Sequence, residues 1–246
     1  MGLGRVVTGP MARRVVLSLV ALVVGLALPT FLLLADIEVV AYHLPPYRKS
    51  FEAAGTSAVT GLTSDQLVWT LTRVLDYGMA KRPDFQFDRA ELDAGPPGRP
   101  AFMAIEVAHM ADVRSLFGLA RTVRGAALGL ALAGAAALWV LDRRAGWARL
   151  ARGLITGAAV FLLGWAALAA FAVIDFNAFW TLFHETLFTN ELWLLPEDSL
   201  LIQMLPESLF RTLALEVVGL LTVELVVIFG LSGFSLRRRT PGEART

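Results

Sequence analysis

The sequence contains no cysteine, and it has few charged residues for its length of 246. Without cysteine the chain cannot form a disulfide, a thiolate metal site or a cysteine nucleophile, and this suits segments that face an oxidising exterior. Charged residues make up 17% of the sequence, whereas soluble domains carry about 25%. The net charge of +1 gives no sign of the basic surface that nucleic-acid binding requires. With 56% hydrophobic residues and a mean hydropathy of +0.62, the composition is that of a membrane protein.

Four apolar runs are long enough to cross a bilayer. They cover residues 15–35, 122–141, 154–174 and 209–231, and each has about the 20 residues that a helix needs to span the hydrocarbon. Arg13 and Arg14 precede the first run as they would in a signal peptide, but the run is long and no clear cleavage site follows it. We interpret it as a retained anchor. The prediction is an all-α, four-transmembrane-helix bundle forming one integral membrane domain over residues 1–246.

The basic residues predict the orientation of this bundle. They gather before the first run, between the second and third, and after the fourth, at Arg5, Arg13, Arg14, Arg143, Arg144, Arg149, Arg152, Arg237, Arg238 and Arg239. Basic residues favour the cytoplasmic side, so both termini are predicted to be cytoplasmic, although Arg121 and Arg124 enter the second run from outside. Residues 37–120 and 175–208 would then be extracytoplasmic. Any chemistry on the outer face must come from these two segments.

The first outer segment is predicted to contain two helices and a loop. Pro45 and Pro46 are expected to keep its beginning extended, and Ser64 is expected to cap a helix that runs to Gly78. Residues 81–100 are rich in proline and glycine and predict a loop of undetermined role. In the second segment we expect a helix around His184, a short helix capped by Asp198, and Pro206 at the start of the fourth span.

Two of the three histidines lie in similar surroundings. His109 and His184 each fall on the apolar face of a predicted outer helix, and Glu106 and Asp112 lie three residues before and after His109. An imidazole can accept and return a proton near neutral pH, with a carboxylate to fix its tautomer. Spacing alone leaves open that both are buried residues satisfied by local hydrogen bonds. We expect a purely structural role for His43, beside two prolines.

Other chemistries receive weaker support. The two histidines could bind zinc together with Asp112, Glu185 or Glu207, but there is no His-Glu-x-x-His motif. Glu216 and Glu224 lie within the fourth span, where a carboxylate is costly. They could carry protons in a transporter or form packing contacts, and we favour packing. Four spans without obvious inverted repeats argue mildly against transport.

Two stretches resemble a known family. "EVAHMADVRSLF" and "FHETLFTNELWLLPEDSLLIQMLPESLF" resemble motifs of the bacterial lipoprotein intramolecular transacylase family, and "GLTSDQLVWTLTRVLDY" resembles its stretch after the first span. The matching residues are Glu106, His109, Met110, Asp112, Val113, Arg114, Phe183, His184, Leu187, Phe188, Asn190, Trp193, Pro196, Asp198, Leu205, Pro206, Glu207 and Phe210. Leu187 and Leu209 stand where the family has an aromatic residue.

The resemblance implies an acyltransferase of the bacterial cytoplasmic membrane that needs no cofactor. Its partners would be membrane lipids and diacylglyceryl-modified lipoproteins. It would move the sn-2 acyl chain of the glyceryl group to the α-amine of the N-terminal cysteine, on the extracytoplasmic face, and leave a lyso-form lipoprotein. A metal-dependent membrane hydrolase and a small proton-coupled transporter are the alternatives.

The resemblance also implies roles for individual residues. His109 and His184 would be the acid/base pair, without an assignment of which is the acid. Asp112 or Glu106 would orient His109. Arg114, Asn190 or Trp193 would hold the oxyanion, the glyceryl backbone or the peptide, and Asp198 and Glu207 would support the site.

Overall fold

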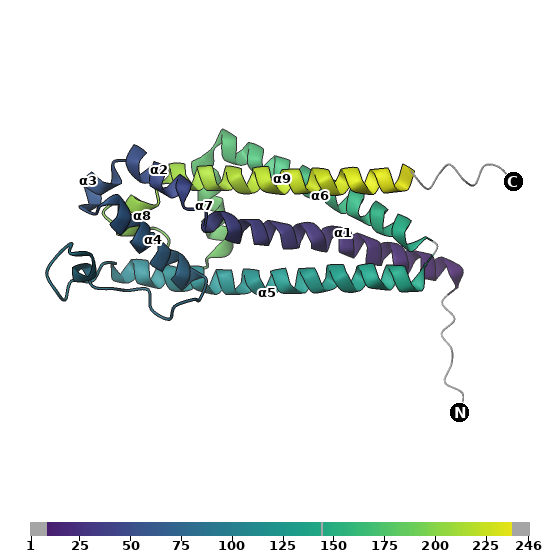
Figure 1. Cartoon of the computed structure of the whole chain (residues 1–246), viewed down its shortest axis with the longest axis horizontal. Coiled ribbons are helices and arrows are strands. Elements are labelled where there is room, and N and C mark those ends of the chain that lie inside the picture. The colour runs from purple at the N-terminus through teal and green to yellow at the C-terminus, as the bar shows by residue number, and fades with distance from the viewer. Residues whose placement is uncertain (1–8, 144, 238–246) are drawn as a thin grey trace, which may run out of the picture. The chain divides into compact units, whose positions relative to one another are not determined.

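The computed structural model describes residues 9–143 and 145–237. Its regular structure within these ranges is helical, which confirms the all-α prediction (Figure 1). The elements are α1 (Pro10–Ala41), α2 (Pro45–Ala53), α3 (Thr56–Thr60), α4 (Ser64–Gly78), the 3-10 helix η1 (Arg89–Leu92), α5 (Ala104–Leu141), α6 (Gly146–Ile174), α7 (Phe176–Leu187), α8 (Leu200–Met204) and α9 (Glu207–Arg237).

Helices α1, α5, α6 and α9 are each long and apolar enough to cross a membrane. They confirm the four predicted spans, but each helix is longer than its apolar run, with 29 to 38 residues. At about 1.5 Å of rise per residue, even the shortest exceeds a hydrocarbon core of about 30 Å. Arg5, Arg144, Arg238 and Arg239 lie outside the described residues, and the predicted orientation stays a prediction.

Three local predictions need correction. Pro45 and Pro46 do not keep the chain extended, because they occupy the first turn of α2, where a missing N–H costs nothing. Thr63, and not Ser64, caps α4: its hydroxyl accepts from the Gln66 backbone N–H, and Gln66 Oε1 accepts from the Thr63 N–H. Ser199 caps α8 in place of Asp198, accepting from the N–H of Ile202.

The described part of the chain divides into two compact units, of which the first comprises residues 9–35, 123–143, 145–167 and 219–237. Within it α1 and α6 approach so closely that side chains do not fit between them. A Cβ added to Gly25 would overlap the carbonyl of Gly153, and one added to Gly157 would overlap the carbonyl of Gly25. Small residues permit such backbone contact between membrane helices. These glycines therefore set the packing distance of the α1–α6 pair.

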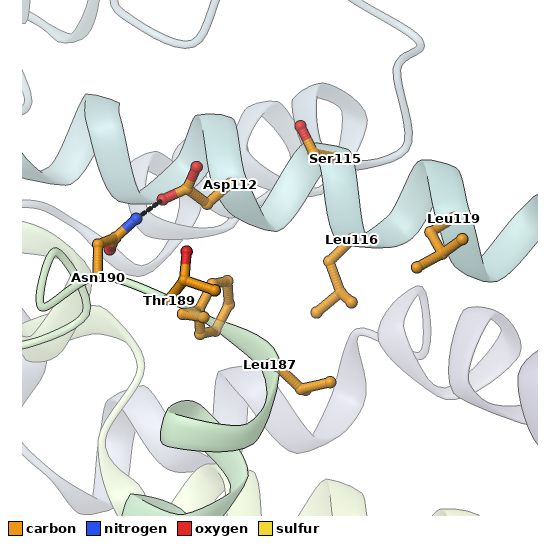
Figure 2. A pocket seen from close by; sticks show the side chains of 8 residues that line it. Asp112, Ser115, Leu116, Leu119, Leu187, Thr189 and Asn190 are labelled. Atoms are coloured by element: carbon orange, nitrogen blue, oxygen red, sulfur yellow. Dashed lines mark hydrogen bonds between the residues drawn. The ribbon is translucent and has the colours of Figure 1, made fainter.

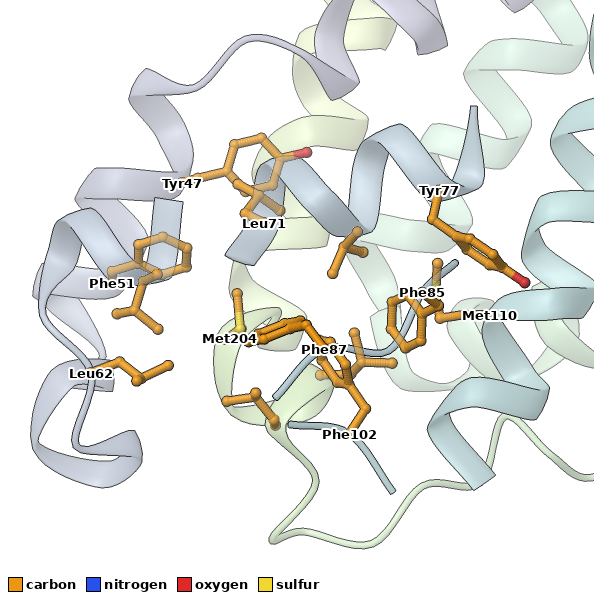
Figure 3. Close-up of a cluster of buried hydrophobic side chains, with 14 of the residues drawn as sticks. Tyr47, Phe51, Leu62, Leu71, Tyr77, Phe85, Phe87, Phe102, Met110 and Met204 are labelled. Atoms are coloured by element: carbon orange, nitrogen blue, oxygen red, sulfur yellow. The ribbon is translucent and has the colours of Figure 1, made fainter. Parts of the chain in front are cut away.

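The second unit comprises residues 36–122 and 168–218 and has its own hydrophobic core (Figure 3). The core joins α2, α4, α8 and the beginnings of α5 and α9 to the 81–100 loop. The loop supplies Phe85 and Phe87, and the Phe85 ring stacks on Phe102 with 4.2 Å between centroids. Further buried members are Tyr47, Phe51, Leu62, Leu67, Leu71, Val74, Tyr77, Leu92, Met110, Leu200, Leu201, Met204 and Leu209. The core fixes the part of α5 that carries His109.

Candidate active site

His109 and His184 lie together within the second unit. His109 comes from the early part of α5 and His184 from the last turn of α7. Their ring centroids are 6.3 Å apart and their planes differ by 34°. The chain thus brings together the two histidines singled out in the sequence.

His184 is held by one hydrogen bond and by aromatic rings. Its Nδ1 lies 2.8 Å from the backbone oxygen of Trp180. A carbonyl can only accept, so Nδ1 carries the hydrogen and Nε2 carries the lone pair. Trp180, Phe183, Phe188 and Trp193 place their ring centroids 4.4 to 5.7 Å from the imidazole.

Burial also tunes the basicity of His184. The residue is only 6% exposed. This desolvation lowers the pKa of His184 below its ordinary value, although the hydrogen bond to Trp180 partly opposes the shift. The imidazole is therefore neutral at neutral pH, with Nε2 ready to accept a proton.

The surroundings of His109 favour the opposite tautomer to that of His184. Its Nδ1 is buried, and no group among the described residues forms a hydrogen bond to it. Buried N–H groups without an acceptor are rarer in proteins than incompletely satisfied acceptors. The environment thus favours a lone pair on Nδ1 and the hydrogen on Nε2. Phe188 packs beside this ring too, with 5.3 Å between centroids, so one aromatic side chain touches both imidazoles.

Glu106 is tied to the segment that starts α8. The residue is fully buried, and its Oε1 accepts hydrogen bonds from Ser199 Oγ at 2.6 Å and from the N–H of Leu201 at 2.8 Å. Its Oε2 accepts from the N–H of Met103. The hydrogen bonds of Glu106 among the described residues thus go to Ser199, Leu201 and Met103, and its role in orienting His109 stays a prediction.

Asp112 and Asn190 form a polar bridge at one end of a cavity (Figure 2). Asp112 Oδ2 accepts from Asn190 Nδ2 at 2.9 Å, and Asn190 Oδ1 accepts from the N–H of Leu192. Asp112 therefore orients the loop after α7 and, like Glu106, makes no hydrogen bond to Nδ1 of His109 within the described chain. The cavity holds about 270 Å³ and is lined by Asp112, Ser115, Leu116, Leu119, Leu187, Phe188, Thr189 and Asn190.

The remaining predicted residues have varied surroundings. Trp193 stacks on His184 with 4.9 Å between centroids. Arg114 turns toward the 81–100 loop: it donates to the backbone oxygen of Arg82 at 2.6 Å, and its guanidinium lies 4.7 Å from the centre of the Tyr77 ring. Asp198 and Glu207 are exposed, and neither is hydrogen-bonded to a histidine in the described part of the chain.

The third histidine contacts one of the span-four carboxylates. Nδ1 of His43 is 3.1 Å from Glu216 Oε2, and both side chains are partly exposed. Across residues 9–143 and 145–237, no three His, Asp or Glu side chains gather in a way that could hold a metal ion.

Trp180, Phe188 and Ser199 have contacts in the site that the sequence did not predict, although Phe188 is one of the residues that match the family motif. Trp180 lies four residues before His184, one helical turn away, so its backbone contact is within reach of pattern reasoning. The contacts of Phe188 with His109 and of Ser199 with Glu106 join distant parts of the chain, and no local pattern indicates them.

Comparison with known proteins gives this geometry its context. The family model described as "Lipoprotein intramolecular transacylase Lit" matches residues 22–210. The chain belongs to this family. The transacylase is thus an acyltransferase, as the sequence predicted, and the hydrolase and transporter alternatives fall away. No curated protein matches it in sequence.

Solved structures share the fold of this transacylase. The in meso structure of the membrane-integral lipoprotein intramolecular transacylase Lit from Bacillus cereus is 18% identical, with a TM-score of 0.69 over 92% of this chain and 98% of that one. Two variants of the same protein, with a histidine replaced by arginine or by alanine, are 17% identical with TM-scores of 0.66. They cover 92% of this chain and 95% and 96% of their own. The likeness supports a multi-pass membrane protein.

Proposed function

We propose that this transacylase moves the sn-2 acyl chain of a diacylglyceryl lipoprotein to the α-amine of its N-terminal cysteine, with His109 and His184 as the catalytic pair. The observation that carries the proposal is the meeting of the two imidazole rings, 6.3 Å apart, at the junction of α5 and α7. The nucleophile belongs to the substrate, so the enzyme needs no serine or cysteine nucleophile.

His184 is the general base in this proposal. Its Nε2 lone pair takes a proton from the amine as the new N–C bond forms at the ester carbonyl. The resulting imidazolium then gives this proton to the glycerol oxygen as the C–O bond breaks. The hydrogen bond from Nδ1 to the Trp180 oxygen holds the ring in one tautomer and stabilises the positive charge during the transfer.

His109 is the hydrogen-bond donor. With its hydrogen on Nε2, the neutral imidazole can donate to the carbonyl oxygen, where negative charge develops in the tetrahedral intermediate. A neutral donor also avoids placing two imidazolium ions 6.3 Å apart, which like-charge repulsion disfavours. Because amine and ester belong to one molecule, positioning supplies much of the rate.

Mass spectrometry of a co-expressed lipoprotein tests this function. The host should lack any other N-acylating enzyme, and the variants are His109→Ala and His184→Ala. We expect wild type to convert the lipoprotein to the N-acyl lyso form and both variants to lose conversion. His43→Ala is the matched control, because His43 contacts Glu216 and not the pair, and it should keep full conversion. Full conversion by His184→Ala or His109→Ala would remove that histidine from the mechanism.

We further propose that the site faces the extracytoplasmic side of the bacterial cytoplasmic membrane and that both termini are cytoplasmic. The basic residues flanking the spans support this topology. A reporter that is fluorescent only in the cytoplasm, fused to the C-terminus, should be bright. A dark fusion, together with an active periplasmic reporter at the same position, would reverse the topology.

A further inference from the structure

The cavity of Figure 2 combines one charged side chain with an apolar wall. Asp112 is the only formally charged residue among the eight that line it, and it stands beside Asn190, Thr189 and Ser115. Leu116, Leu119 and Leu187 lie toward the other side of the same cavity in this view. The cavity therefore fits a ligand with one positive group next to a hydrocarbon chain.

The charge of Asp112 is not neutralised by a neighbouring cation. Asn190 occupies one carboxylate oxygen, and across the described residues no lysine or arginine forms an ion pair with Asp112. Arg114, two residues further along α5, is directed to the Arg82 carbonyl and the Tyr77 ring. The half-buried carboxylate thus keeps an oxygen for a ligand.

The cavity also adjoins the two histidines. Asp112 lies three residues after His109 on α5, where i and i+3 side chains are neighbours. Phe188 lines the cavity and packs against both imidazole rings. A group bound to Asp112 is therefore held next to the catalytic pair.

We propose that this cavity is the subsite for the α-ammonium group of the lipoprotein's N-terminal cysteine, with Asp112 as its counter-ion and the leucine wall receiving the first part of an acyl chain. This inference rests on the proposed function and names the group that Asp112 recognises. An α-amino group has an ordinary pKa of about 7.7–8.0 and arrives mostly protonated at neutral pH. The ammonium loses one proton to solvent before its lone pair can attack, and His184 takes the second proton as the N–C bond forms. A hydrogen bond between two charged groups is about twice as strong as one between neutral groups.

Two inert analogues test the subsite without chemistry. Both are lipopeptides in which ether-linked alkyl chains replace the acyl esters; one keeps the α-amine and the other carries hydrogen in its place. Binding is measured to the full-length protein in lipid nanodiscs. We expect wild type to bind the amine on the order of tenfold more tightly than its partner, and Asp112→Asn to bind the two alike.

Glu185→Gln is the matched control. It removes one negative charge from an exposed side chain beside His184 that does not line the cavity, and it should keep the preference for the amine. Equal binding of both analogues by wild type would overturn the proposal, and so would an unchanged preference in Asp112→Asn. The wild-type comparison needs no variant, so a folding defect in Asp112→Asn cannot conceal the answer.

The outcomes separate this inference from the proposed function. If wild type shows no preference for the amine while His184→Ala still abolishes conversion of the lipoprotein, the subsite is wrong and the proposed chemistry stands. If the preference is present and depends on Asp112 while both histidine variants convert fully, the subsite stands and the proposed chemistry is wrong.

Discussion

The hydroxyl of Ser199 donates a hydrogen bond of 2.6 Å to Oε1 of Glu106, joining residues 93 positions apart. The same carboxylate accepts from the N–H groups of Leu201 and Met103, so it fastens the start of α8 to the start of α5. His109 lies less than one turn after Glu106 on α5. The buried carboxylate therefore anchors the end of the helix that carries one of the catalytic imidazoles.

We expect Glu106→Gln to lower the free energy of unfolding by about 2–3 kcal/mol, because the new amide NH₂ would face a buried N–H donor and leave it unsatisfied. Thermal unfolding of the purified protein in detergent, converted with its unfolding enthalpy, measures the change. Glu197→Gln alters an exposed side chain and should stay within about 0.5 kcal/mol of wild type. If Glu106→Gln is as stable as wild type, the carboxylate of Glu106 is not needed for the stability of the fold.

The two histidines should behave as one catalytic unit. We expect His109→Ala and His184→Ala each to lower kcat/KM by about 10²–10⁴-fold. The double variant should lose much less than the product of these factors. Once one histidine is gone the proton transfer that depends on both is already impaired, so removing the second histidine has little further effect. Initial rates on a synthetic diacylglyceryl lipopeptide give the three values. Multiplicative losses would mean that the imidazoles act independently.

Acidification should protonate His184 only below pH 6.5. Burial lowers the pKa of His184 in the folded protein, whereas free histidine titrates at about 6.5. The general base therefore stays neutral as pH falls through 6.5, and the loss of activity that comes from protonating His184 begins only at more acidic pH. In that window the unfolded chain binds more protons than the folded one, so acidification also lowers stability.

Nitrogen NMR of histidine-labelled protein, with His184→Ala to assign the signal, measures the titration midpoint of His184. Trp193→Leu is an informative companion, because it removes the ring stacked 4.9 Å from the imidazole. Greater access to water should raise the midpoint toward 6.5. A wild-type midpoint at or above 6.5 would contradict the proposed neutral base.

Gly157→Ala should destabilise the α1–α6 pair, because its Cβ would meet the backbone carbonyl of Gly25 and backbone cannot yield as a flexible side chain does. Overpacking of this kind costs about 1–3 kcal/mol. Gly164→Ala, on the same helix with nothing within 4 Å of its added Cβ, should be neutral or slightly stabilising. Unfolding in detergent compares them; a Gly157→Ala protein as stable as Gly164→Ala would refute the close contact.

The sequence predicts the membrane spans well, because a run of about 20 consecutive apolar residues is rarely found except in a transmembrane helix. It does not predict where the helices end. Helix α5 continues without interruption from Ala104 to Leu141, and hydropathy detects only its later part. The caps were misplaced by one residue at Thr63 and Ser199, because adjacent polar residues are equally good caps until the backbone selects one.

The candidate site, like the fold, is predicted by the sequence only in part. The positions of His109 and His184 on apolar helix faces follow from spacing, and the family motifs indicate that they act together. Their environment depends on contacts between distant segments. Phe188 packs against both imidazole rings, and Trp193 stacks on His184. Ser199 donates a hydrogen bond to Glu106. The resemblance implied that Asp112 or Glu106 orients His109, whereas the hydrogen bonds of Glu106 go to Ser199, Leu201 and Met103.

The aromatic rings around His184 bear on the choice between transfer and hydrolysis. A base strong enough to deprotonate an amine can also activate water, and an ester attacked by water would release its fatty acid. Trp180, Phe183, Phe188 and Trp193 occupy the space around the imidazole and leave His184 only 6% exposed. For the proposed reaction, this enclosure would direct the acyl group to the amine and preserve it from loss as free fatty acid.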